Sequence, residues 1–380
     1  MTTVLTQIIA DYERELLADP LTADTFRLEG SLDRLRKELE ATGMASDVVH
    51  AAFGIYFHLR DREFTLNLLA RYLALPLPVE EEAWARWNLV DTLALLRKCE
   101  EVVKAQQDFL EWARRSLEHD RLLWVMSDCT QAFCWLEIGK ADEWLGIFHK
   151  IVQNTKPSEA NRVDRYYYLR TAGMCLSKLG RTQAALEIAN RLLAVAQEDE
   201  GWKHSFRVKI DSYILAMNVY QEAGDTPNLV KVGDEACALV DEYAASLSEL
   251  STEQRICLRT PLTPADRLGR WDVEPYTDPI ICLRGYYHNM AAPLYRAGQY
   301  QLAIPLFERA MKYKITSRNC YLWHAASVWA ATKDRSKVLP LLRRIAPMYG
   351  NKKGFYKSVP EFQDVADDPE SQQAASVVDP

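Results

Sequence analysis

The sequence predicts an all-α protein built from repeated helix–turn–helix pairs. Glycine and proline are sparse, at 15 and 16 of 380 residues, and many prolines fall between apolar-periodic segments. Helices that must run uninterrupted require this distribution. With 48% hydrophobic and 26% charged residues, the composition is typical of a folded soluble protein. The length suits two or three domains, or one elongated array of repeats.

Residues 1–45 are expected to form an N-terminal helical cap over the first repeat. They contain amphipathic pieces, and Ser31 and Asp33 are possible helix caps in one of them. A terminal repeat that exposed its apolar face would need such a cover.

Helix–turn–helix units then recur through residues 46–245. The most regular one runs from Tyr166 to Ala196, with Gly180 as its turn. Weaker copies lie around Gly54, Gly139 and Gly224. The segment 84–117 has the right length and apolar periodicity but no turn glycine, so we interpret it as a degenerate repeat.

The clearest unit lies in residues 280–350, which are expected to hold the last repeats and a C-terminal cap. A helix with Ala291 and Ala292 precedes a turn at Gly298, and the next helix carries Ala303, Phe307 and Ala310 at core spacing. The following unit is expected to turn at Lys333–Asp334.

These units resemble the tetratricopeptide repeat. The resemblance implies a right-handed α-solenoid of about seven tetratricopeptide-like helix–turn–helix units, whose first helices line an inner groove. One pair cannot bury its apolar stripe alone, so neighbouring pairs stack. The steps from Gly139 to Gly180 to Gly224 exceed the roughly 34 residues of the minimal repeat, which predicts longer helices.

Two segments depart from the repeat pattern. Residues 246–279 are predicted to be an insertion, in which Trp271 could anchor a partner or fix the loop to the array. Residues 351–380 contain GFYKSVPEF, which starts at Gly354 and resembles the closing segment that follows the last repeat in proteins of this type. They are expected to end in a disordered tail.

Composition and missing motifs argue against several function classes. A net charge of −7 disfavours a mainly electrostatic nucleic-acid binder. The sequence contains no phosphate-binding loop, dinucleotide-binding turn, serine nucleophile elbow or HExxH helix, so we expect no enzyme and no cofactor. The eight cysteines are dispersed without zinc-ligand spacing, which predicts reduced thiols and no metal site. No signal peptide or membrane span is recognisable, and the protein is expected to be cytoplasmic.

If the resemblance holds, the inner groove would be lined by polar and aromatic residues of the first helices. Polar surface residues are common without any function, so these positions could equally be solvated or packed against neighbouring helices. The candidate partner-binding residues, together with Trp271 of the insertion, are Tyr167, Arg170, Thr171, Lys178, Asn218, Gln221, His288, Asn289 and His324.

Three functions remain open at this point. The leading hypothesis is a noncatalytic scaffold, adaptor or regulatory subunit that binds a peptide or protein in the groove. The second is a sensor whose solenoid changes shape when a small ligand or peptide binds. An enzyme with a nonstandard site around His288 and His324 ranks third, because a histidine pair alone is insufficient for catalysis. Oligomeric state and partner identity are not determined by the sequence.

Overall fold

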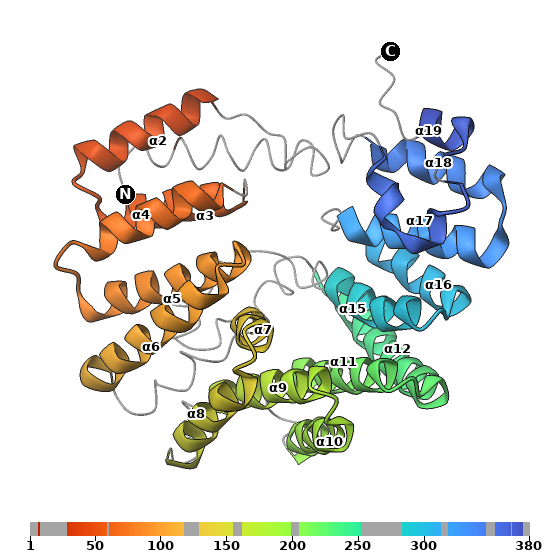
Figure 1. Cartoon of the computed structure of the whole chain (residues 1–380), viewed down its shortest axis with the longest axis horizontal. Helices are drawn as coiled ribbons and strands as arrows, with labels where there is room; N and C mark the ends of the chain where they lie inside the picture. The colour runs from red at the N-terminus through yellow and green to blue at the C-terminus, as the bar shows by residue number, and fades with distance from the viewer. Residues whose placement is uncertain are drawn as a thin grey trace. The chain divides into compact units, whose positions relative to one another are not determined.

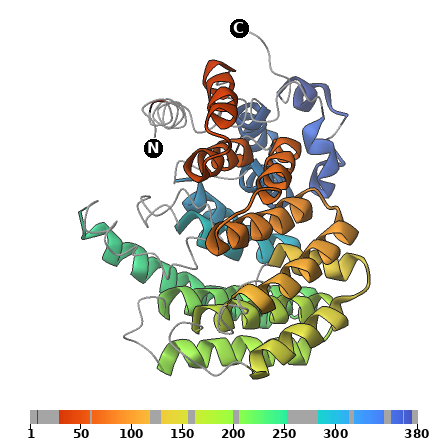
Figure 2. The ribbon, with the colours of Figure 1, turned by 90° about the vertical axis from the view of Figure 1, so that its left-hand side faces the viewer.

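Every element of regular secondary structure in the described part of the chain is a helix in the computed structural model (Figures 1 and 2). The structure describes residue 7 and residues 29–58, 61–117, 129–154, 162–198, 205–251, 283–312, 318–346, 354–365 and 367–374. In both views every coloured element is a helix. Within these ranges, no helix combines the length and the apolar character needed to cross a membrane.

The chain divides into two compact units, with a boundary between residues 188 and 189. Unit 1 holds α2 (Glu29–Ala41), α3 (Ser46–His58), α4 (Arg62–Leu73), α5 (Val79–Leu95), α6 (Cys99–Ser116), α7 (Cys129–Glu137), α8 (Ala141–Asn154) and α9 (Arg162–Lys178). The boundary lies inside α10 (Thr182–Glu198). Unit 2 holds α11 (Ser205–Glu222), α12 (Thr226–Ser248), α15 (Leu283–Arg296), α16 (Tyr300–Met311), α17 (Arg318–Thr332), α18 (Arg335–Ile345), η6 (Phe355–Ser358), η7 (Pro360–Phe362) and α19 (Pro369–Ala374).

A recurrent turn joins the two helices of each of four pairs. Gly139, Gly180, Gly224 and Gly298 have φ angles of 70° to 72°, in the left-handed region that glycine adopts without strain. The backbone N–H of the next residue donates to a carbonyl five positions back, as in Gln299 to Leu294 at 2.8 Å. This left-handed cap satisfies helix-end carbonyls and reverses the chain within two residues.

The pair α5–α6, which the sequence suggested as a degenerate repeat, uses the same turn without glycine. Arg97 takes a φ of 56° there, and the N–H of Lys98 donates to the Leu93 carbonyl at 3.1 Å. A turn glycine is therefore sufficient but not required, because tertiary packing can hold an ordinary residue in the left-handed region. The turn expected at Lys333–Asp334 is confirmed, with a φ of 51° at Lys333.

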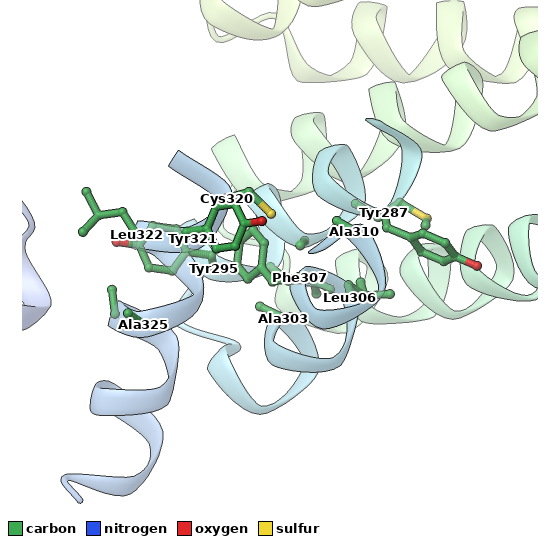
Figure 3. Packing of buried hydrophobic residues seen from close by; sticks show 14 of the residues in the cluster. Tyr287, Tyr295, Ala303, Leu306, Phe307, Ala310, Cys320, Tyr321, Leu322 and Ala325 are labelled. Carbon is green, nitrogen blue, oxygen red and sulfur yellow. The ribbon is translucent and has the colours of Figure 1, made fainter. Parts of the chain in front are cut away.

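Small residues and aromatic rings fill the core of unit 2 (Figure 3). Ala303 and Ala310 of α16 are fully buried, and so is the ring of Phe307 between them. These residues match the core positions that the sequence predicted. Helix α15 contacts α11, α12, α16 and α17, so it forms the centre of this unit.

Several tryptophans pack between helices. Trp84, Trp135 and Trp144 are fully buried in unit 1. Five cysteines with described side chains are free thiols, four of them buried, as expected for small apolar residues.

Two boundaries differ from the sequence-based expectations. Ser31 and Asp33 lie inside α2, so they do not cap its start. Helix α12 continues to Ser248, past the predicted start of the insertion at residue 246, while residues 252–282 lie outside the described ranges.

The expected disordered tail is ordered at least to Ala374. Tyr356, Val359, Phe362 and Val365 recur every third residue and are buried in the core of unit 2. The apolar side chains at this spacing outweigh the polar composition that suggested disorder. We call residues 354–374 the closing segment.

Candidate functional site

The predicted groove residues of unit 1 lie on α9 and differ in exposure. Lys178 is exposed and Arg170 is half-buried, whereas Thr171 is only 1% exposed. Thr171 therefore packs inside the unit and offers no surface to a partner. The side chain of Tyr167 lies outside the described part, as does Trp271.

Asn218 and Gln221 lie on α11 in unit 2, and both are half-buried. The side-chain amide of Asn218 donates to the Ile214 carbonyl at 2.7 Å, within its own helix. The Oε1 atom of Gln221 is buried and accepts no hydrogen bond from the described residues. A buried amide oxygen without a donor is costly, so Gln221 is the residue of this pair better suited to bind a ligand group.

His288 belongs to an aromatic cluster formed by α15 and α17. Its ring stacks on Trp323, with centroids 5.5 Å apart and planes 7° apart. Tyr295, two helical turns after His288, also stacks on Trp323 at 5.5 Å. The Arg296 guanidinium lies 5.6 Å from the Trp323 ring centroid, a cation–π distance. Trp323 is half-buried, so part of this cluster reaches the surface.

Burial keeps the His288 imidazole neutral at pH 7. Desolvation, reinforced by the positive charge of Arg296, lowers the pKa of His288 to about 4. Its Nδ1 atom is buried and has no hydrogen-bond partner among the described residues. The imidazole therefore holds an unused polar atom beside an aromatic surface, which is an arrangement that can bind a polar ligand group.

His324 is closer to a core residue than to a groove residue. It is 5% exposed, and burial lowers its pKa although Glu308 opposes the shift. Its Nε2 lies 3.5 Å from Oε1 of Glu308 but makes no hydrogen bond to the described residues. The sequence-based prediction placed it on the groove surface; the structure buries it because α16 and α18 pack against α17.

Asn289 is the predicted residue that the structure exposes most clearly in α15. It lies nine positions before its turn residue Gly298, as Thr171 does before Gly180 and His324 before Lys333. Three equivalent positions thus carry polar side chains, but only Asn289 is exposed. The register was predictable from the turns; the exposure was not.

One polar cluster in unit 1 escaped the sequence analysis. Glu81 accepts hydrogen bonds from Tyr72 Oη at 2.9 Å and from His50 Nε2 at 2.8 Å, and the Ser46 hydroxyl lies 2.7 Å from Tyr72 Oη. Burial and the Glu81 carboxylate raise the pKa of Tyr72 to about 12, although the hydrogen bond to Ser46 opposes the shift. No local sequence signal pairs Glu81 with His50, 31 positions away.

The described residues contain no group of three or more histidine, cysteine or acidic side chains placed to hold a metal ion. The hydrogen bond between His50 and Glu81 joins α3 to α5. Their chemistry suits packing and recognition of polar groups.

Comparisons with known proteins add little to this picture. No protein-family model matches the chain, and no curated protein is significantly similar to it. Among solved structures, the structure of Naa15/Naa10 bound to HypK-THB aligns with 98% of this chain and 66% of that chain, at 14% identity and a TM-score of 0.20. This chain thus spans slightly less than two thirds of that one, and a TM-score this low does not show a shared fold.

Proposed function

We propose that the protein is a noncatalytic scaffold or adaptor that binds a peptide or protein along the first helices of its helix pairs. The observation that supports the proposal best is the left-handed turn, which recurs between the two helices of several pairs with the same backbone hydrogen bond. A regular array of this kind presents a row of side chains to an extended or helical partner. We infer a right-handed α-solenoid of about seven tetratricopeptide-like units as the finer architecture.

Side chains on these helices support this proposal. Lys178 and Asn289 are exposed, and Arg170 is half-buried on its first helix. The partly exposed Trp323, which stacks on His288, offers an aromatic surface of the kind that dominates binding energy at protein interfaces. Thr171 and His324 would act only by supporting their neighbours, because both are buried.

The proposal is tested by pull-down from a cell extract with a variant carrying Arg170→Ala, Lys178→Ala and Asn289→Ala. The matched control carries Gln183→Ala and Gln301→Ala, at exposed positions on the second helices of the same pairs. Circular dichroism must show that both variants are folded. A partner that is retained by the control and lost by the first variant is the expected result; equal recovery of the partner by both variants would contradict it.

A further inference from the structure

Charge is distributed unevenly along unit 2. Residues 283–346 carry eleven lysines and arginines against two acidic residues, a net charge of +9, in a chain whose net charge is −7. The closing segment carries five acidic residues against one lysine, a net charge of −4. Helices α15 to α18 therefore form a basic block inside an acidic protein, and an acidic segment follows it directly.

The closing segment shows what this block binds. Asp364 accepts a hydrogen bond from Lys333 Nζ at 2.8 Å and another from Trp329 Nε1 at 2.8 Å. Asp368 lies 3.3 Å from Arg335. Because Lys333 and Arg335 flank the turn between α17 and α18, the two carboxylates join both of these helices to the closing segment.

A second acidic contact lies at the turn between α15 and α16. The Glu361 carboxylate accepts hydrogen bonds from Tyr295 Oη at 2.7 Å and from Tyr300 Oη at 3.1 Å. Tyr356 and Phe362 of the same segment are fully buried. The block thus already holds a peptide in which carboxylates alternate with apolar anchors.

Much of the positive charge is left uncovered by this segment. Helix α18 carries four exposed basic residues and no acidic one. Arg335 pairs with Asp368 of the closing segment, and the Nζ atom of Lys337 lies 3.9 Å from the Asp334 carboxylate at the start of the helix. Arg343 and Arg344 lie in its last turn. Lys337 and Arg344 are seven positions apart, so they share one face of the helix. The Arg344 guanidinium lies 5.5 Å from the Tyr321 ring, which restricts its orientation.

We propose that the exposed face of α18, formed by Lys337, Arg343 and Arg344, binds an acidic peptide segment of a protein partner. The inference rests on the proposed scaffold function and names its partner chemistry: several carboxylates spaced by apolar side chains, as in the closing segment. Guanidinium groups favour carboxylates through charge-assisted, bidentate hydrogen bonds. The acidic peptide is favoured over nucleic acid because the block already pairs with carboxylates, and because the acidic chain as a whole repels a long polyanion.

The test measures binding to the full chain by fluorescence anisotropy at low salt. The probe is a labelled peptide of about 16 residues in which glutamates and aspartates alternate with phenylalanines, a length comparable to that of the closing segment. The same peptide with Gln and Asn in place of the acidic residues, and a single-stranded oligonucleotide of equal charge, are run in parallel. The variant Lys337→Glu/Arg343→Glu/Arg344→Glu reverses the charge of this face.

Its matched control is Lys104→Glu/Arg114→Glu/Arg115→Glu on α6, which makes the same charge change at exposed positions of unit 1. We expect the α18 variant to raise the Kd of the acidic peptide by about tenfold or more and the α6 variant to change it by less than about twofold. If charge reversal unfolds the protein, Arg343→Gln/Arg344→Gln should still raise the Kd, by a smaller factor.

The proposal is overturned if the intact protein does not bind the acidic peptide, if the α6 and α18 variants lose binding equally, or if the oligonucleotide binds more tightly than the peptide. Self-association that the α18 variant abolishes, without peptide binding, would assign the face to a second copy of the chain. In one outcome the Arg170→Ala/Lys178→Ala/Asn289→Ala variant keeps its partner in the pull-down while the α18 variant still loses the acidic peptide. That combination would contradict binding along the first helices and would leave the proposal for α18 intact.

Discussion

One histidine in each unit packs against a tryptophan, and the two differ in the charge beside them. In unit 1, His50 stacks on Trp84 with ring centroids 4.0 Å apart, and Glu81 accepts its hydrogen bond at 2.8 Å. In unit 2, His288 stacks on Trp323, and its charged neighbour is Arg296. Burial lowers the pKa of both histidines, but Glu81 opposes the shift at His50 whereas Arg296 adds to it at His288.

The comparison teaches that similar aromatic packing can serve two electrostatic purposes. A carboxylate beside a half-buried imidazole opposes the lowering of its pKa by burial, whereas a guanidinium adds to that lowering. Ring stacking positions the histidine in both units. The neighbouring charge decides whether the effect of burial on the pKa of the histidine is opposed or reinforced.

The largest expected difference concerns the tryptophans. Trp84 is fully buried, so Trp84→Ala should lower the free energy of unfolding by about 3–5 kcal/mol. Trp323 is half-buried, and Trp323→Ala should cost roughly half as much. Urea unfolding followed by circular dichroism measures both values. Equal losses of unfolding free energy in the two variants would show that Trp84 and Trp323 do not differ in how much their packing stabilises the protein.

Acidification should separate the two histidines next. Because the pKa of His288 is lowered to about 4, the unfolded state binds more protons than the folded state between about pH 6.5 and pH 4. The free energy of unfolding should therefore fall as pH falls through that window, by at most about 3 kcal/mol from this group. His288→Phe keeps the ring and should remove this part of the pH dependence.

The control for that experiment is His149→Phe, at an exposed position of α8. It should leave the pH dependence of unfolding unchanged. An identical pH profile for wild type and the His288→Phe variant would mean that Arg296 and burial do not keep His288 neutral.

Removing the carboxylate in unit 1 should make His50 resemble His288. Glu81→Gln keeps the shape of the side chain and deletes the charge that opposes desolvation, so the pKa of His50 should fall. Loss of the charged hydrogen bond should also cost about 1–2 kcal/mol of stability. The imidazole signals in a proton NMR titration report the pKa; a midpoint that rises would refute the assigned role of Glu81.

The smallest effect extends the comparison of the units to their turns. Arg97 in unit 1 and Gly298 in unit 2 adopt the same left-handed conformation. Arg97→Gly should stabilise the protein by up to about 1 kcal/mol, because glycine tolerates a positive φ, whereas Gly298→Ala should destabilise it by about 1 kcal/mol. Thermal unfolding of the two variants should shift in opposite directions. A shift in the same direction would show that strain at the turn is not what distinguishes these residues.

Local sequence patterns predicted the turns and core positions well and the site poorly. Gly180 and Gly298 marked turns because their backbone requirement is local, and Ala303 and Phe307 marked the core because helical spacing is local too. Arg97 was missed because no residue preference signals a left-handed arginine. His324 was misplaced because its burial depends on which neighbouring helices cover α17.

The sequence by itself determined that the chain forms pairs of helices, where four of the glycine turns lie, and that basic residues concentrate between residues 283 and 346. These properties depend on residues close together in the chain. Only the tertiary structure decided that Glu81 meets His50, that Trp323 stacks on His288, and that the closing segment lies against the basic block. Such contacts join residues far apart in sequence, and their energies depend on burial and distance, which exist only once the helices have packed.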